Sequence, residues 1–368
     1  MNRRNFLRNS SLAALASGTL PPLPVLRQDK QPEKKQPEQK EAVKSVDELV
    51  TDKARTAIQT GLDYLANEQI ASGHRKGSFG TGGYAGGVAV SALSGLAFLC
   101  NGSSPTSGPY AENIRRCTDF ILRNVKESGF IGDDDRRFSN MYGHGYAMLY
   151  LTQVFGMSKR KDLRKKLEKS IQMTCNIQNR FGGWRYHPTK KDSDLSITIC
   201  QIMALRAAHS CGLKVSNEVR EKTIGYIEIC QRPDGSFRYH ERGGRTSVAL
   251  TSAGVVSWYS AGIYEGPKIE KSLEWIFKHR PGKASGKIVS PMNYYYAHYY
   301  AVQAMWHAQI QSPHYWNRWY PLIRDELIDD MRSHDGTWPD SRVGPEYGTA
   351  MSCIILQMPF NYVPVFSP

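Results

Sequence analysis

The feature that most constrains the fold of this chain is a repeat of about 52 residues. A glycine followed within two positions by an aromatic residue recurs, and the aromatic residues are Phe79, Phe130, Trp184, Phe237 and Trp338. The last gap spans two periods, and Gly286-Lys287-Ile288 stands where the missing element belongs. A fixed period of this length is typical of repeat architectures. The chain is therefore expected to contain six copies of one supersecondary unit.

Each unit combines two kinds of helix. The first is charged and amphipathic; in one copy Leu163, Leu167 and Ile171 lie one helical turn apart with charged residues between them. The second has almost no charge, at Val88–Cys100, Gly145–Phe155, Leu195–Leu205, Val248–Ile263, Tyr294–Ile310 and Gly348–Met358. A helix with one apolar stripe lies at a surface, whereas a helix that is apolar all round is buried. The pattern predicts an all-α protein, an α/α toroid of six hairpins with an outer and an inner ring.

Membrane insertion is the main rival interpretation. The stretch Thr246–Tyr264 has no charged residue over 19 positions, close to the ~20 residues that a spanning helix needs. It is, however, rich in serine, threonine and glycine, and its five counterparts are shorter or more polar. Inner helices of a toroid explain all six stretches together and are the favoured interpretation.

The N-terminal residues are typical of a targeting signal rather than of a folded domain. Residues 1–26 contain Arg3-Arg4-Asn5-Phe6-Leu7 and then a short stretch of small residues, a pattern similar to a bacterial twin-arginine export signal. The alternative is a basic tail with a chance arginine pair. Residues 27–46 are rich in proline, glutamine, lysine and glutamate, so they are expected to form a disordered linker. Residues 47–368 then form the toroid, exported to the periplasm or the cell envelope.

Charge and cysteine content exclude some partners. The formal net charge is +14, but no basic run is interleaved with aromatic residues, so we expect no nucleic-acid binding. The seven cysteines are widely spaced and contain no Cys-x-x-Cys pair, so the sequence predicts no metal site and no cofactor. Buried thiols are expected, although export would allow one or two disulfides.

Two segments carry a family resemblance. Asn176-Ile177-Gln178 followed by Gly183-Trp184, and the run from Cys230 to Phe237, resemble the Q…GxW repeat of squalene and hopene cyclases. Over about residues 50–360 the chain is similar to bacterial, planctomycete-type prenyltransferase and squalene oxidase repeat proteins of the terpene cyclase and protein prenyltransferase superfamily. The resemblance implies the toroid fold. It leaves the function open, because one fold hosts several chemistries and also non-enzymes.

Asp192-Ser193-Asp194-Leu195 resembles the acidic motif of squalene–hopene-type cyclases. The resemblance implies that Asp194 is the catalytic acid that protonates an alkene and that Asp192 is its neighbour. Leu195 stands where the motif has its last acidic residue, and this departure weakens the assignment. The alternative is that Asp194 caps the following helix. The Asp-x-Cys zinc ligands of protein prenyltransferases have no counterpart here.

The N-termini of the inner helices are expected to converge at one end of the barrel. Several polar and aromatic residues enter these helices there, including Tyr142 and the tyrosine-rich run from Tyr294 to Tyr300. Convergent polar groups in an apolar pocket are typical of ligand sites. The candidate substrate-binding residues are His144, Tyr146, Trp184, Tyr295, His298, Tyr299, Glu346 and Tyr347.

Three functions are consistent with these residues. The first is an isoprenoid cyclase with Asp194 as the general acid. The second is a non-catalytic, exported lipid- or glycan-binding or scaffold protein. The third is a carbohydrate-active enzyme that uses Asp194, Glu346 and His298 as acid and base. The expected partner is a small apolar ligand, isoprenoid or lipid, or a glycan. The apolar ending, residues 361–366, is expected to pack over the barrel or else to touch a membrane surface; no oligomeric state is indicated.

Overall fold

The structure is a computed structural model that describes residues 42–132, 140–284, 287–288 and 293–367. Residues 41–368 form one compact unit. The export signal predicted at 1–26 and most of the linker predicted at 27–46 lie outside the described residues. The first described helix, α1 (Val46–Leu49), begins at the end of that linker, where Ser45 and Glu48 form a capping box.

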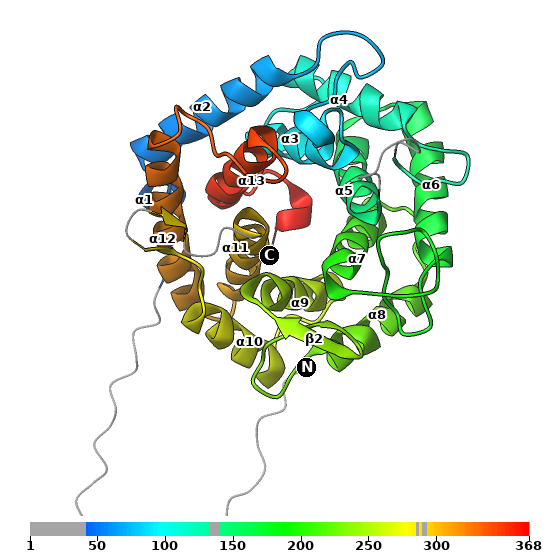
Figure 1. Ribbon diagram of the computed structural model, residues 1–368, viewed down its shortest axis with the longest axis vertical. Helices are drawn as coiled ribbons and strands as arrows, with labels where there is room; N and C mark the ends of the chain where they lie inside the picture. Colours follow the sequence, from blue (N-terminus) through cyan, green and yellow to red (C-terminus); the bar gives the residue numbers. More distant parts are fainter. Residues whose placement is uncertain (1–41, 133–139, 285–286, 289–292, 368) are drawn as a thin grey trace, which may run out of the picture. The chain divides into compact units, whose positions relative to one another are not determined.

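The described residues of this unit form a double ring of helices (Figure 1). The outer helices are α2 (Asp52–Glu68), α4 (Ala111–Arg123), α6 (Lys161–Asn176), α8 (Asn217–Cys230), α10 (Pro267–Lys278) and α12 (Pro313–Arg332). The inner helices are α3 (Val88–Cys100), α5 (Met141–Met157), α7 (Leu195–Ser210), α9 (Val248–Ser260), α11 (Tyr294–Ala308) and α13 (Pro345–Gln357). Each outer helix and the inner helix after it make one hairpin, so the predicted α/α toroid of six hairpins is confirmed.

Burial follows the predicted charge pattern. In the outer helix α4 one stripe is buried, including Ile114, Cys117 and Ile121. In the inner helix α7 every residue from Leu195 to Leu205 is buried. Among the described residues, none of the helices combines the length and the apolar character needed to cross a bilayer. All seven cysteines lie in the described residues and all are free thiols.

In the described repeats the glycine lets a turn dock against the next outer helix. Gly182 has φ +97°, and a Cβ on it would lie 2.0 Å from the Lys222 carbonyl oxygen of α8. Gly77 has φ +89°, and a Cβ there would lie 2.1 Å from the Arg116 carbonyl oxygen of α4. Only glycine combines this backbone conformation with such a close approach.

A glutamine near the end of the preceding outer helix fastens the same contact. The Gln178 side-chain nitrogen donates to the carbonyl oxygens of Gly182 and Val219, each at 2.9 Å. In this way one side chain joins its own turn to helix α8. Gln69 repeats the arrangement in the first unit, where it bonds Gly77 and Asn113. These bonds give a physical reason for the glutamine and glycine of the sequence repeat.

A third repeated bond joins the turn to its own inner helix in five units. The backbone N–H of Trp184 donates to the Thr198 hydroxyl in the first turn of α7 at 3.1 Å. The equivalent pairs are Phe79 and Ser91, Ile131 and His144, Phe237 and Thr251, and Trp338 and Thr349. In the second unit the buried residue of the repeat is therefore Ile131, and the sequence assignment to Phe130 was one residue early. Phe130 is only half-buried, whereas Ile131 is fully buried.

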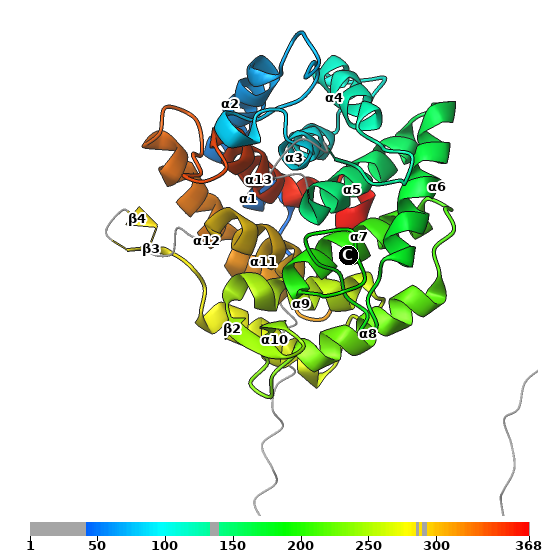
Figure 2. The same cartoon turned by 45° about the vertical axis from the view of Figure 1, so that its right-hand side comes forward.

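Short strands and 3-10 turns complete the unit. Strands β1 (Arg238–His240) and β2 (Gly243–Thr246) form an antiparallel hairpin between α8 and α9. A second small hairpin is made by β3 (Lys283–Ala284) and β4 (Lys287–Ile288) (Figure 2). The element expected at Gly286-Lys287-Ile288 falls partly here, and Gly286 lies outside the described residues. The remaining elements are the 3-10 turns η1 (Gly82–Tyr84), η2 (Met358–Phe360) and η3 (Pro364–Phe366).

The C-terminal segment enters the ring, as Figure 1 shows in red. Val363, Val365 and Phe366 are buried, and the Val365 amide donates to the Gln153 side chain of α5 at 3.4 Å. The Phe366 ring packs edge-on against Tyr299 of α11. The segment therefore packs against the barrel, as the first of the two sequence interpretations expected.

The close approach of turns and helices gives a test of the packing. A Cβ on Gly348 in α13 would lie 1.9 Å from the Trp338 carbonyl oxygen. We expect Gly348→Ala to lower the free energy of unfolding by about 1–3 kcal/mol, because backbone must move to admit the methyl group. Gly225 in α8 has no heavy atom within 4 Å of its Cβ position, so Gly225→Ala should instead raise stability by up to about 1 kcal/mol. Denaturant unfolding measures both, and equal effects of the two substitutions would contradict this packing.

Candidate functional site

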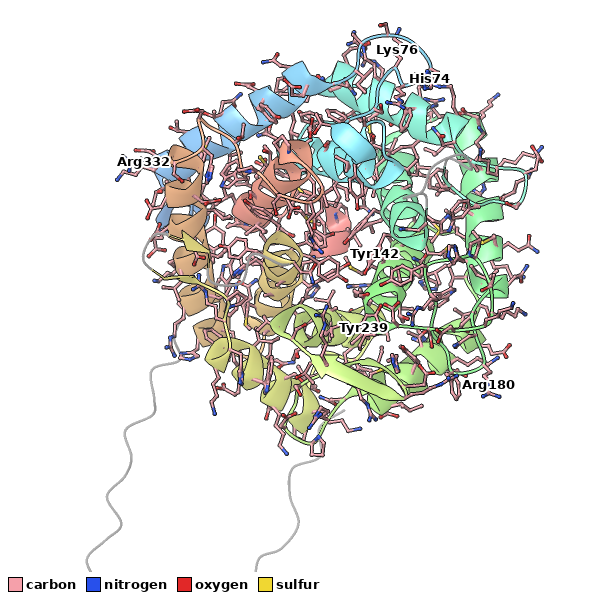
Figure 3. The ribbon with its side chains drawn as sticks, in the orientation of Figure 1. His74, Lys76, Tyr142, Arg180, Tyr239 and Arg332 are labelled. Carbon is pink, nitrogen blue, oxygen red and sulfur yellow. The ribbon has the colours of Figure 1, made fainter. Side chains whose placement is uncertain are left out.

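The N-terminal ends of the inner helices surround a cavity of about 510 Å³. Residues of all six inner helices, or their N-caps, line it, among them Val88, Tyr142, Ser196, Leu250, Tyr296 and Tyr347. Figure 3 shows Tyr142 and Tyr239 turned toward the middle of the ring, while His74, Arg180 and Arg332 lie at its periphery. The predicted convergence at one end of the barrel therefore produces a cavity of ligand size.

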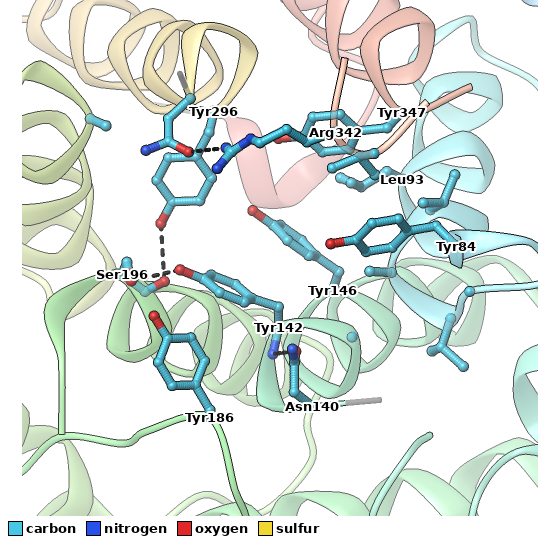
Figure 4. A pocket seen from close by; sticks show the side chains of 18 of the residues that line it. Tyr84, Leu93, Asn140, Tyr142, Tyr146, Tyr186, Ser196, Tyr296, Arg342 and Tyr347 are labelled. Carbon is cyan, nitrogen blue, oxygen red and sulfur yellow. Dashed lines mark hydrogen bonds between the residues drawn. The ribbon is translucent and has the colours of Figure 1, made fainter. Parts of the chain in front are cut away.

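Seven tyrosines dominate the lining: Tyr84, Tyr142, Tyr146, Tyr186, Tyr239, Tyr296 and Tyr347. Several of them surround one space in the close view (Figure 4). Hydrogen bonds fix some of the hydroxyls: Tyr186 and Tyr239 bond each other at 2.6 Å, and Tyr296 donates to the Ser196 carbonyl oxygen at 3.0 Å. Aliphatic residues such as Val88, Leu93 and Leu250 fill the surface between the rings. The cavity thus offers aromatic faces together with a few positioned hydroxyls.

Three of these phenols, those of Tyr142, Tyr146 and Tyr296, are neutral at ordinary pH. Burial raises the pKa of Tyr142, Tyr146 and Tyr296 well above the usual value for tyrosine. Removal of a phenol from water disfavours its charged form. The tyrosines can therefore donate and accept hydrogen bonds and stack on a ligand, but they do not supply a negative charge.

Asp194 is the N-cap of the inner helix α7. Its Oδ1 atom accepts bonds from the Ile197 backbone N–H at 2.9 Å and from the Ser196 hydroxyl at 2.5 Å. The capping interpretation of this residue is thereby confirmed. The Oδ2 atom is buried without a hydrogen bond and lies 3.6 Å from Nε of Arg185. A cap alone requires only one oxygen, so the second oxygen leaves this carboxyl available for other chemistry.

The protonation of Asp194 is shifted by its surroundings. Burial raises the pKa of its carboxyl above the ordinary 3.8, while hydrogen bonds from Ser196 and the Ile197 amide and the charge of Arg185 oppose the rise. The burial effect is the largest of these contributions because the carboxylate loses its water shell. Asp194 therefore holds its proton at higher pH than an exposed aspartate does.

Asp194 does not itself line the cavity, but it is connected to it. The Tyr142 hydroxyl, which faces the cavity, donates to the Ser196 hydroxyl at 2.6 Å (Figure 4). The Ser196 hydroxyl in turn donates to Asp194. The chain of hydroxyls from Tyr142 to Asp194 is a proton path of two hydrogen bonds. Asp192 differs, because its half-exposed carboxylate pairs with Arg185 at 3.1 Å.

Of the predicted substrate-binding residues, Tyr146 and Tyr347 line the cavity. Tyr299 does not line the cavity, but its ring packs edge-on against Tyr146, which does. Glu346 is buried and accepts a bond from the Thr81 hydroxyl at 3.2 Å, and burial raises the pKa of its carboxyl. It does not belong to the lining.

The structure places both predicted histidines outside the cavity. His144 accepts the Ile131 amide and bonds the Thr174 hydroxyl, and burial lowers its pKa to about 3. His298 is fully buried between Tyr294 and Trp319, and burial likewise lowers its pKa to about 3. Each histidine is two residues from a cavity-facing tyrosine, and two residues on a helix correspond to a rotation of about 200°. They therefore point outward and remain neutral.

Trp184 and Tyr295 contact the outer helices rather than the cavity. The Trp184 indole donates to the Thr174 carbonyl oxygen at 2.8 Å. Tyr295 donates to the Asp330 carboxylate at 3.2 Å. Sequence reasoning placed Tyr295 at the cavity because an inner helix that is buried all round does not reveal which face points inward.

Sequence reasoning missed Tyr84, Tyr186 and Tyr239. Tyr186 and Tyr239 each stand two residues after the buried aromatic residue of a repeat, Trp184 and Phe237. This repeat position faces the cavity in both of these units, so an alignment of the repeats was the signal that could have found it. Among the described residues, no cluster of three or more His, Cys, Asp or Glu side chains is placed to hold a metal ion.

Comparisons with known proteins agree with this architecture. Residues 113–281 match the family described as the prenyltransferase alpha-alpha toroid domain. No curated protein matches the chain in sequence. The type II terpene cyclase MstE from Scytonema is similar in structure, with TM-score 0.57 and 12% identity over 85% of this chain and 99% of that one.

Two carbohydrate-active enzymes have similar folds. An alpha-amylase from Clostridium perfringens has TM-score 0.58 and 12% identity, covering 82% of this chain and 97% of its own. The GH76 alpha-mannanase from Bacteroides thetaiotaomicron has TM-score 0.61 and 9% identity, covering 84% and 96%. The chain therefore has the fold of the terpene cyclase and prenyltransferase toroid superfamily, a fold that glycosidases share.

Asp194 is both a helix cap and a carboxyl with a raised pKa, and this combination gives a second test. Asparagine caps helices as well as aspartate does, whereas alanine removes the cap and lowers stability by about 1 kcal/mol. The pKa of Asp194 is higher in the folded protein than the ordinary 3.8. At pH values between 3.8 and that raised pKa, the folded protein therefore binds more protons than the unfolded chain. Stability of the wild type should therefore fall as pH rises through that window.

Asp194→Asn lacks this titration, so its stability relative to the wild type should increase with pH, while Asp194→Ala should be less stable at every pH. Asp192→Asn is the matched control, because its half-exposed side chain makes no cap. Denaturant unfolding at a series of pH values measures all three variants. A difference between Asp194→Asn and wild type that does not change with pH would contradict a raised pKa.

Proposed function

We propose that this protein binds an isoprenoid-like small molecule in the tyrosine-lined cavity and that Asp194 exchanges a proton with it. The observation that carries the proposal is the arrangement of this one cavity. A buried, protonatable carboxyl lies two hydrogen bonds from a space lined by seven tyrosines and by aliphatic side chains. Such a site combines an apolar chamber with a source of protons.

The lining supports a largely apolar ligand. Aromatic rings bury large areas and their faces stabilise positive charge, and Val88, Leu93 and Leu250 add aliphatic surface. The structural similarity to a type II terpene cyclase, which has been seen in complex with geranylgeranyl dihydroxybenzoate as its substrate, is consistent with this class of ligand. The similarity concerns the fold alone, so the lining residues carry the argument.

The reaction class that fits the site is a redox-neutral rearrangement started by a proton. With Asp194 protonated, its proton can pass to Ser196 while the Ser196 proton passes to Tyr142 and the Tyr142 proton passes to an alkene carbon of the ligand. The alkene π electrons form the new C–H bond and leave a carbocation facing the tyrosine rings. Loss of a proton from the rearranged cation along the same path restores Asp194, so nothing else is consumed.

Glycoside hydrolysis is less well supported. It requires two carboxyl groups that flank the bond to be cleaved. None of the described residues that line the cavity is an aspartate, a glutamate or a histidine. Oligosaccharides nevertheless belong in the binding test, because tyrosine faces also stack on sugars.

We also propose that residues 1–26 direct export of the protein. The proposal rests on the arginine pair and the short stretch of small residues that follows it. Replacement of both Arg3 and Arg4 by lysine should then leave the protein in the cytoplasm of a bacterial host, as cell fractionation would measure. Unchanged export would remove the proposal.

The proposed function is tested with polyprenyl alcohols in D₂O. Native mass spectrometry should detect farnesol or geranylgeraniol bound to wild type and to Asp194→Asn. Only the wild type and the control Asp192→Asn should release a product that carries carbon-bound deuterium. Because the reaction needs protonated Asp194, the rate should fall as pH rises through the raised pKa of this carboxyl.

The outcomes separate the candidate functions. Binding without deuterium incorporation by any variant would leave a ligand-binding protein and overturn the proton transfer. Binding of oligosaccharides in place of polyprenyl alcohols would contradict the isoprenoid assignment. Equal deuterium incorporation by wild type and Asp194→Asn would show that another group supplies the proton.

A further inference from the structure

Two arginines line the cavity at its open side. Arg245 belongs to strand β2, and Arg342 belongs to the loop between α12 and α13. Both are exposed, whereas Tyr146 and Leu93 at the depth of the cavity are buried. The two cations thus stand at the entrance and the apolar surface lies behind them.

Neither guanidinium is neutralised within the described residues. Arg342 donates to the uncharged side chain of Asn293 at 2.6 Å (Figure 4). The Arg245 side chain has no hydrogen bond or ion pair with the described residues. Asp340 is close to Arg342 in sequence, but its Oδ1 accepts the backbone amides of Arg342 and Val343. Other arginines of the protein are paired, for example Arg280 with Glu326 at 2.6 Å.

The rest of the described lining adds no negative charge. The described lining residues include no carboxylate, and burial raises the pKa of Tyr142, Tyr146 and Tyr296, so these phenols stay neutral. The inner helices also point their N-termini, the positive ends of their dipoles, toward the cavity. Helices α3, α11 and α13 lack a side-chain hydrogen bond at their N-caps. Within the described lining, the charged side chains are therefore the two arginines.

We propose that the ligand of this cavity carries an anionic head group, a phosphate or a carboxylate, that Arg245 and Arg342 bind at the entrance. The apolar body of the ligand then lies between the tyrosines. Guanidinium groups present planar pairs of N–H donors that match both kinds of anion. This inference rests on the proposed function, because it names the class of isoprenoid-like molecule that the site would accept.

The test compares ligands that share one apolar tail and differ in the head group. Farnesol, farnesoic acid and farnesyl phosphate are titrated into the full chain by isothermal calorimetry. We expect both anions to bind at least about tenfold more tightly than the alcohol, with an advantage that shrinks at high salt. Inorganic phosphate alone serves as the probe for the head group without a tail.

Three variants complete the design. Arg245→Gln and Arg342→Gln should each reduce the affinity for the two anions about three- to tenfold and leave the affinity for farnesol unchanged. Arg242→Gln is the matched control, since Arg242 lies in the same β1–β2 hairpin, is exposed and does not line the cavity. Circular dichroism verifies that the variants are folded, as their exposed positions predict.

Failure of this inference is distinguishable from failure of the proposed function. Equal binding of farnesol and both anions, unaffected by the arginine variants, would overturn the anionic head group while the apolar cavity stands. If Arg242→Gln lost as much anion affinity as Arg245→Gln and Arg342→Gln, the effect would be one of general surface charge. That result would also overturn the anionic head group. Absence of binding by all three farnesyl compounds would overturn both proposals. Preference for one anion over the other identifies the head group.

Discussion

The contact on which the ring depends is the docking of each glycine turn against the next outer helix. A Cβ on Gly182 would come within 2.0 Å of a carbonyl oxygen of α8, and the Gln178 side chain bridges the same two segments. Each hairpin is therefore held mainly by its neighbour, as in other repeat proteins. The last turn docks on the first outer helix, since Gly61 of α2 has no room for a Cβ beside Trp338. That final contact closes the ring.

Closure of the ring also creates the site. Because every hairpin has the same hand, all inner helices begin at one end, and the side chains of their first turns meet there. The outward face of each first turn is reserved for the bond to the repeat turn, which Thr198 makes in α7 and His144 makes in α5. His298 is the fifth residue of α11, as Thr349 is of α13. The inward face is left to the tyrosines, and Asp194 caps α7 while its second oxygen stays unbonded.

The sequence predicted the architecture well because period and charge are properties of whole segments. The alternation of charged and uncharged stretches identified both rings, and Tyr146 and Tyr347 were placed at the cavity. The sequence could not separate the two faces of an inner helix, since both are buried, so His144, Tyr295 and His298 were assigned to the wrong face. Arg245 and Arg342 could not be found because exposed arginines in loops and short strands carry no periodic signal. Their role depends on which distant segments share one opening.

The most direct measurement for the central claim, that the cavity at the N-terminal ends of the inner helices holds the ligand, is photo-crosslinking. A farnesyl phosphate analogue with a diazirine in its tail would be irradiated with the full chain, and the labelled peptides would be mapped by mass spectrometry. This account predicts label on the α3, α5 and α11 segments that contain Leu93, Tyr146 and Tyr296, and its loss in the presence of excess unlabelled compound. Label confined to exposed apolar residues such as Ile310, Leu322 and Tyr362 would contradict it.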